Sequence, residues 1–175
     1  MGGRAMEKHE RFTHEGIELL RVRISLPSLE DVDAVHGFWV QMTDAAYAFC
    51  HDRLMPYAID CYERDPDPKK RLHFAPFRYR LWGETRYRSD TLLSVLIEAS
   101  LSREGAGQRR QYFCDAQNFS LPDGCLLSPR DALSLYLGEP VSKKRCKHVK
   151  SLLLTERVAY AKHGDTWQIF CEKEQ

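Results

Sequence analysis

Two neighbouring segments that alternate between apolar and polar residues constrain the fold most. In Phe77–Arg88 the odd positions are mostly apolar and the even positions are mostly arginine. In residues 91–103 the odd positions from Leu93 to Leu101 are apolar, and the even positions include serines and Glu98. A period of two is typical of a β-strand whose two faces meet different surroundings. We therefore expect two long strands that form one antiparallel hairpin.

The loop of this hairpin has to keep the two apolar faces on the same side of the sheet. A two-residue loop after Arg88 would place apolar residues of one strand opposite polar residues of the other, because a shift of one residue turns every side chain to the other face. We predict a loop of odd length or a bulge near Gly83. Either one brings Arg80 close to Glu98 on the polar face.

The N-terminal half predicts one strand followed by a long helix. Ile17–Leu26 is rich in apolar and β-branched residues and ends at Pro27, which is typical of a strand. Apolar residues then recur at steps of three and four over residues 29–53, behind Ser28 as the N-cap. Pro56 should kink or restart this helix, because proline removes a helical hydrogen bond. A second helical piece is expected over residues 57–63.

The C-terminal half predicts three more strands and a capped helix. Residues 109–121 form a third long strand, whose mixed alternation indicates a bulge. Ser128 caps a helix whose first residue is Pro129. Residues 158–161 and 166–171 flank a Gly-Asp turn and form a hairpin.

Together these segments predict an α+β fold, in which an antiparallel sheet of long strands packs against a long N-terminal helix and one or two shorter helices. A chain of 175 residues is long enough for one ordinary domain and too short for two. We expect residues 1–15 to be a flexible segment and residues 16–175 to form a single domain.

Charge and cysteine usage exclude several classes of protein. The formal net charge is +1, which argues against a general nucleic-acid coat or a polybasic membrane anchor. No apolar run resembles a secretory signal or reaches the roughly 18–20 residues that span a bilayer. The chain as written is therefore expected in the cytoplasm, with no membrane contact. There the six cysteines should be reduced and mostly buried.

The polar face of Phe77–Arg88 is the strongest candidate binding surface. It carries Arg78, Arg80, Trp82, Arg86 and Arg88. Arginine beside an exposed aromatic ring can hold an acidic protein surface, a glycan or, less in keeping with the net charge, nucleic acid. Two alternatives without a binding role stay open. The arginines pair with Glu98 and other acids across the sheet, or the long helix covers this face.

Evidence for an enzyme is thin. Cys50, His51 and Asp52 are consecutive, and neighbours on a helix point about 100° apart, so they cannot form a nucleophile–base relay. There is no phosphate-binding glycine loop, dinucleotide fingerprint, nucleophile elbow or zinc-protease motif, and the cysteine spacings do not match a structural zinc site. We expect no catalytic residue, no metal and no cofactor. A Cys/His site would require Cys50 and His51 to converge with Cys146 and His148.

One stretch carries a family resemblance. Residues 118–133 give a strand ending in Phe119, a Pro-Asp-Gly turn, a short return of two leucines and the capped helix. This unit, with the order of elements before it, resembles the RsiV-type extracytoplasmic domain, a domain of unknown function shared by the anti-sigma factor RsiV and the peptidoglycan deacetylase PdaC. The resemblance covers residues 17–170. It implies an α+β fold with an antiparallel sheet on helices, and relatives are often extracytoplasmic.

The functional expectation is a non-catalytic binding or regulatory module. Its partner would be a protein or a glycan held by the cationic and aromatic strand face, and not nucleic acid. The alternative is a small hydrolase or transferase that uses an unrecognised Cys/His site.

Overall fold

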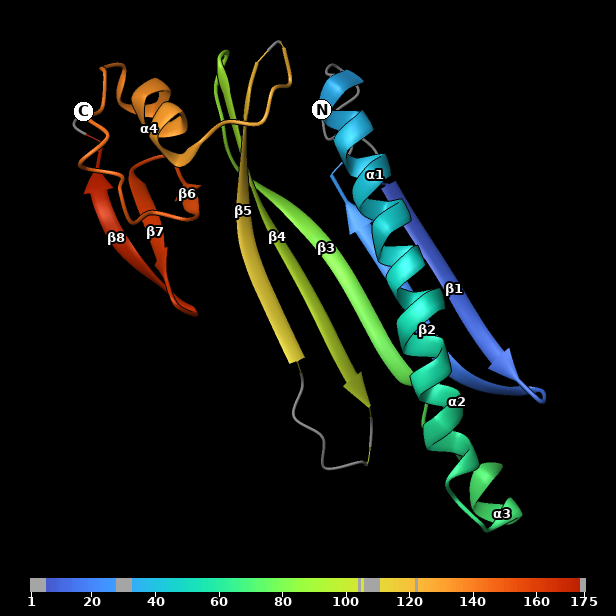
Figure 1. Cartoon of the computed structure of the whole chain (residues 1–175). Coiled ribbons are helices and arrows are strands. Elements are labelled where there is room, and N and C mark those ends of the chain that lie inside the picture. The colour runs from blue at the N-terminus through green and yellow to red at the C-terminus, as the bar shows by residue number, and fades with distance from the viewer. Residues whose placement is uncertain (1–5, 28–32, 104, 106–110, 122, 174–175) are drawn as a thin grey trace.

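The structure is a computed structural model that describes residues 6–27, 33–103, 105, 111–121 and 123–173. These residues form an α+β fold with two sheets (Figure 1). The large sheet has the spatial order β1 (Met6–His14), β2 (Ile17–Leu26), β3 (Phe77–Arg88), β4 (Leu92–Arg103) and β5 (Gln111–Ser120). The small sheet contains β6 (Leu152–Leu154), β7 (Val158–His163) and β8 (Thr166–Glu172). The helices are α1 (Asp33–Phe49), α2 (Met55–Glu63), α3 (Pro68–Arg71) and α4 (Pro129–Leu137).

The strands of the large sheet are antiparallel except for β2 and β3, which run parallel. Two parallel strands need a long crossover connection, and here α1, α2 and α3 lie between them in the chain. The crossover gives β2 and β3 a register in which Arg21 lies beside Arg78 and Arg23 beside Arg80.

The first strand corrects one expectation. We expected residues 1–15 to be a flexible segment, but Met6–His14 pairs with β2 as an edge strand. Its Met6 and Phe12 pack against the core beneath the helices. The remaining residues of the strand are mostly charged or polar and exposed, and charged side chains on an edge strand prevent pairing with other chains. Because few of its residues are apolar, the strand has no clear alternation in the sequence.

The long helix passes Pro56 without a break. Between α1 and α2 the π-helical turn Cys50–Leu54 widens the helix, and the Met55 N–H donates to the Cys50 carbonyl, five residues back. Pro56 then lies in the first turn of α2, where a missing N–H costs least. The predicted second helical piece is confirmed as α2. The predicted Ser28 cap lies outside the described residues.

Two cores lie on opposite faces of the large sheet. Trp39 of α1 packs edge-on against Phe119 of β5, and the odd residues of β4 from Leu93 to Ile97 join the same core. On the other face, α4 and the small sheet form a second core around Tyr87 and Tyr136. Even residues of β4 and β5 serve this second face, because the Leu154 N–H donates to Ser94 Oγ and Asn118 Nδ2 donates to the Leu152 carbonyl.

A bulge in β3 lets residues of this strand pack in both cores. Thr85 lies opposite Val95, Tyr87 lies opposite Ser94, and Arg86 between them has no cross-strand partner. The predicted bulge is therefore confirmed, although it lies three residues beyond Gly83. Phe77, Tyr79 and Leu81 share the face of the odd apolar residues of β4, whereas Tyr87 lies beyond the bulge and turns to the other face. The bulge predicted for residues 109–121 is wrong over Gln111–Ser120, where the register with β4 is regular.

Several local predictions are confirmed. Ser128 Oγ accepts a hydrogen bond from the Asp131 N–H at the start of α4, and β7 and β8 meet at the Gly164-Asp165 turn.

All six cysteines are free, but only Cys50 is fully buried, so the expectation of mostly buried thiols is wrong. No helix among the described residues is long and apolar enough to cross a membrane.

Two glycines give a matched test of this packing. A Cβ on Gly83 would lie 2.9 Å from Pro27 Cδ and 3.3 Å from Leu26 Cδ2, whereas a Cβ on Gly37 of α1 would meet no atom within 4 Å. Gly83→Ala should lower the free energy of unfolding by about 1–3 kcal/mol through overpacking. Gly37→Ala should raise it by about 0.5–1 kcal/mol, because alanine favours the helix. Chemical denaturation measures both, and equal effects would contradict the close approach of β2 to β3 at Gly83.

Candidate functional site

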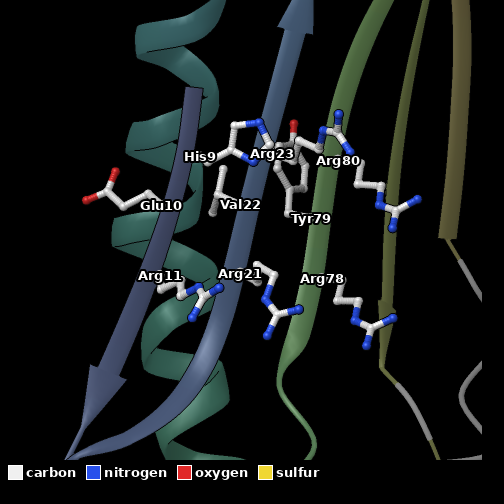
Figure 2. A pocket seen from close by; sticks show the side chains of 9 residues that line it. All are labelled: His9, Glu10, Arg11, Arg21, Val22, Arg23, Arg78, Tyr79 and Arg80. Carbon is white, nitrogen blue, oxygen red and sulfur yellow. The ribbon is translucent and has the colours of Figure 1, made fainter. Parts of the chain in front are cut away.

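An arginine-rich surface lies on the face of the large sheet opposite α1. Burial of Val22 and Ile24 under the helix turns the alternate residues Arg21 and Arg23 outward. The same alternation turns out the even residues of β3 and the odd residues of β1. We call this surface the arginine face; it consists of Arg11, Arg21, Arg23, Arg78 and Arg80. Figure 2 shows these side chains on three neighbouring strands, with the helix behind them.

The strand register arranges the face in rows. One row contains Arg11, Arg21 and Arg78, and the next contains His9, Arg23 and Arg80. Neighbouring strands lie about 4.7–4.9 Å apart, and alternate residues of one strand lie about 6.6–6.8 Å apart. Five arginine side chains therefore project from a small area of the sheet.

Two adjoining hollows follow these rows. The larger, about 500 Å³, is lined by both rows, and the smaller, about 290 Å³, is lined by Arg23, Ser25, Arg80, Leu81 and Trp82. Arg23 and Arg80 line both. The half-buried Trp82 lies 6.4 Å, between ring centroids, from the exposed Tyr112 of β5. The face thus combines cationic rows with an aromatic pair, in which Trp82 lies in the next row and Tyr112 lies in the row of Arg80.

Glu18 compensates two of the arginine charges, both in the first row. Arg21 Nε donates to Glu18 Oε1 at 2.8 Å, and Arg11 Nε lies 3.5 Å from Glu18 Oε2. Arg23 and Arg80 are both exposed, and no ion pair of the described residues reaches either of them. Glu98 accepts a hydrogen bond from the Tyr112 hydroxyl. Of the two alternatives, covering by the helix is wrong for Arg78, Arg80 and Trp82. Pairing with acids holds for Arg86, which pairs with Glu84, whereas no ion pair joins Arg80 to Glu98.

The structure brings together three of the five residues that the sequence singles out. Arg78, Arg80 and Trp82 lie on the open face, one row apart. Arg86 is the bulge residue and pairs with Glu84 at 2.8 Å. Arg88 lies opposite Leu93, whose side chain belongs to the core under the helices, so the bulge moves Arg88 to the other face.

Sequence reasoning missed the contribution of β1 and β2. Arg21 and Arg23 alternate with apolar residues in Ile17–Leu26, and this alternation is the signal that could have found them. Their place beside Arg78 and Arg80 comes from the parallel pairing of β2 with β3, across a connection of fifty residues, which no local pattern reveals.

The Cys/His alternative depends on residues that lie apart. Cys50 is buried in the core beneath the helices, whereas Cys146 packs against the second core on the other face of the sheet. Burial, and then the negative charge of Glu10, raise the pKa of the Cys50 thiol to about 12, so the reactive thiolate is suppressed. Within the described residues, no group of three or more His, Cys, Asp or Glu side chains could hold a metal ion.

Comparisons with known proteins give structural neighbours only. No protein-family model and no curated protein matches the sequence. The chain is similar to the crystal structure of a DUF3298 family protein from Pseudomonas aeruginosa PAO1, with 15% identity, a TM-score of 0.46, and coverage of 91% of this chain and 80% of that one. It is also similar to a DUF3298 family member from Bacteroides fragilis NCTC 9343, with 11% identity, a TM-score of 0.48, and coverage of 90% and 81%. DUF3298 is a domain of unknown function, and the resemblance to the RsiV-type domain stays a prediction.

Thiol reactivity tests the environment of Cys50. At pH 8 in the native protein, alkylation of the exposed Cys125 should be at least tenfold faster than that of Cys50, because only the thiolate reacts and Cys50 is both buried and protonated. Mass spectrometry of peptides from a time course of iodoacetamide labelling gives both rates. Equal rates would contradict the burial of Cys50, and unfolding in denaturant should remove the difference.

Repulsion between neighbouring arginines of the arginine face should lower the free energy of unfolding. Like charges directly opposite in a sheet are destabilising, typically by about 0.2–1 kcal/mol. The double variant Arg23→Gln/Arg80→Gln should therefore raise the free energy of unfolding by that amount at low ionic strength, measured by chemical denaturation. Arg53→Gln/Arg157→Gln removes two exposed arginines elsewhere and is the control for the change in net charge. A loss of stability in the first variant but not in the control would show that Arg23 and Arg80 serve the fold.

Proposed function

We propose that this protein is a non-catalytic binding module that holds an anionic partner, a protein or a glycan, on its arginine face. The observation that carries this proposal is the exposed pair Arg23 and Arg80, side by side on parallel strands and joined by no ion pair of the described residues. Two adjacent guanidinium groups repel each other, and an anion between them removes that repulsion. An acidic group of a partner would therefore bind favourably between Arg23 and Arg80.

The chemistry of arginine supports binding over catalysis at this face. A guanidinium group stays protonated at any physiological pH and presents a planar fork of donors that matches carboxylate, sulfate or phosphate. It can hold and orient an anion, but it does not accept a proton. His9, the one imidazole in these two rows, lies on the edge strand, 3.9 Å from Glu7.

Trp82 would supply the apolar part of the contact. Interface energy is concentrated in arginine and large aromatic residues that become buried on binding. Trp82 lines the same hollow as Arg23 and Arg80 and is only half-buried in the free protein. Covering it would add hydrophobic energy to charge-assisted hydrogen bonds.

Binding of three polyanions tests the proposal. Poly-L-glutamate, heparin and an oligo-dT single strand represent acidic protein, acidic glycan and nucleic acid, and isothermal titration calorimetry measures their affinities. At least one of the first two should bind, and Arg23→Gln/Arg80→Gln should weaken it tenfold or more. Trp82→Ala should cost about 2 kcal/mol.

The control variant for this titration is Arg53→Gln/Arg157→Gln, which should change affinity less than twofold. Equal losses in both double variants would mean that only net charge matters and would contradict the proposed face. Oligo-dT as the tightest ligand, with a steep log-linear fall in affinity with salt, would replace the proposal by nucleic-acid binding.

A further inference from the structure

The position of the acidic residues around the arginine face limits what its partner can be. The row beyond Arg23 and Arg80 contains Glu7, Ser25, Trp82 and Glu98 on consecutive strands. The opposite end is closed by Glu18, which pairs with Arg21 and Arg11. The positive zone is therefore two rows long in the strand direction, with carboxylates at both ends.

This boundary disfavours a long uniform polyanion that runs along the strands. A nucleic acid or a sulfated polysaccharide carries its charges without interruption, so its next anionic group would meet Glu7 and Glu98. Like charges at close range cost energy and reject such partners. A partner with two anionic groups followed by an uncharged group fits the row pattern better.

The spacing of the rows matches an extended polypeptide. Alternate residues of a β-strand lie about 6.6–6.8 Å apart and point to the same side. Arg21 and Arg23, and likewise Arg78 and Arg80, have this spacing, and so do the alternate side chains of an extended peptide lying along them. One carboxylate of such a peptide would lie between Arg23 and Arg80, where its hydrogen bonds are charge-assisted. The other would lie in the row of Arg21 and Arg78, where Arg21 keeps N–H donors beyond those directed at Glu18.

The third position of the same peptide face would reach Trp82. Trp82 is two residues beyond Arg80 on β3, and Ser25 is two residues beyond Arg23 on β2. The hollow lined by Arg23, Ser25, Arg80, Leu81 and Trp82 is about 290 Å³, which has room for one aliphatic side chain. An apolar residue there covers the indole and keeps negative charge away from Glu7 and Glu98.

We infer that the partner of the arginine face is an extended acidic peptide segment with carboxylates at two alternate positions and an apolar residue at the next alternate position. This inference rests on the proposed function and names its ligand. The rows specify the spacing, and the carboxylates at the boundary specify where the acidic run ends.

Three blocked peptides of equal length test the inference by calorimetry. The first, Thr-Glu-Thr-Glu-Thr-Leu-Thr, has the inferred pattern. The second, Thr-Thr-Glu-Glu-Leu-Thr-Thr, has the same composition with adjacent glutamates, which point to opposite sides of an extended chain. The third, Thr-Glu-Thr-Glu-Thr-Glu-Thr, has a third glutamate in place of leucine. The first should bind at least fivefold more tightly than either of the others.

Variants of the protein assign the preference to named residues. Arg23→Gln/Arg80→Gln should remove binding of the first peptide, and Arg53→Gln/Arg157→Gln should leave it unchanged. Glu7→Gln/Glu98→Gln should close the gap between the first and third peptides, because it removes the acidic boundary. This variant leaves Trp82 in place, so it tests the third position even if Trp82→Ala does not fold.

The outcomes separate this inference from the proposed function. Equal affinity for the first two peptides, or an unchanged gap in Glu7→Gln/Glu98→Gln, would overturn the inferred pattern. Heparin binding that depends on Arg23 and Arg80, with no binding of any peptide, would overturn the inference and support the proposed function. If the protein binds none of the polyanions and none of the peptides, both the inference and the proposed function are overturned.

Discussion

The packing of α1 and α2 on one face of the large sheet is the constraint on which the rest of the structure depends. Side chains in a strand alternate between the two faces, so burial of Val22, Ile24 and Leu81 under the helices leaves no choice for their neighbours. Arg23 and Arg80 must point to the opposite side. A shift of one residue in the pairing of β2 with β3 would bury arginine and expose the core, so the same apolar contacts that stabilise the fold also hold the arginine rows in register.

The bulge at Arg86 divides this sheet into two working parts. Beyond it Tyr87 changes face and enters the second core with α4 and the small sheet. Before it, the face that carries Arg78, Arg80 and Trp82 is left without a covering element among the described residues. One sheet therefore supports two cores at one end and presents a charged surface at the other, as Figure 1 shows for the position of the small sheet beside β5.

Patterns within a single element were predictable from the sequence, and relations between elements were not. The two-residue period gave Phe77–Arg88 its correct bounds and indicated an irregularity in the hairpin, a loop of odd length or a bulge near Gly83, because both follow from local alternation. The bulge itself lies at Arg86. Pro56 marked the junction of two helical pieces, but the π-helical turn that carries the chain past it depends on local backbone bonding. The role of Arg21 and Arg23 could not be foreseen, since it requires the parallel register with β3.

Arginine side chains observed directly by NMR give the most decisive measurement. Each arginine has its own Nε–Hε signal, and its position reports on what the guanidinium group binds. On addition of an acidic polypeptide, we expect the Nε–Hε signals of Arg23 and Arg80 to shift and to exchange more slowly with water, while those of Arg53 and Arg157 stay in place. Uniform small shifts of all four signals would show that the polypeptide senses net charge alone, and would contradict a binding site on this face of the sheet.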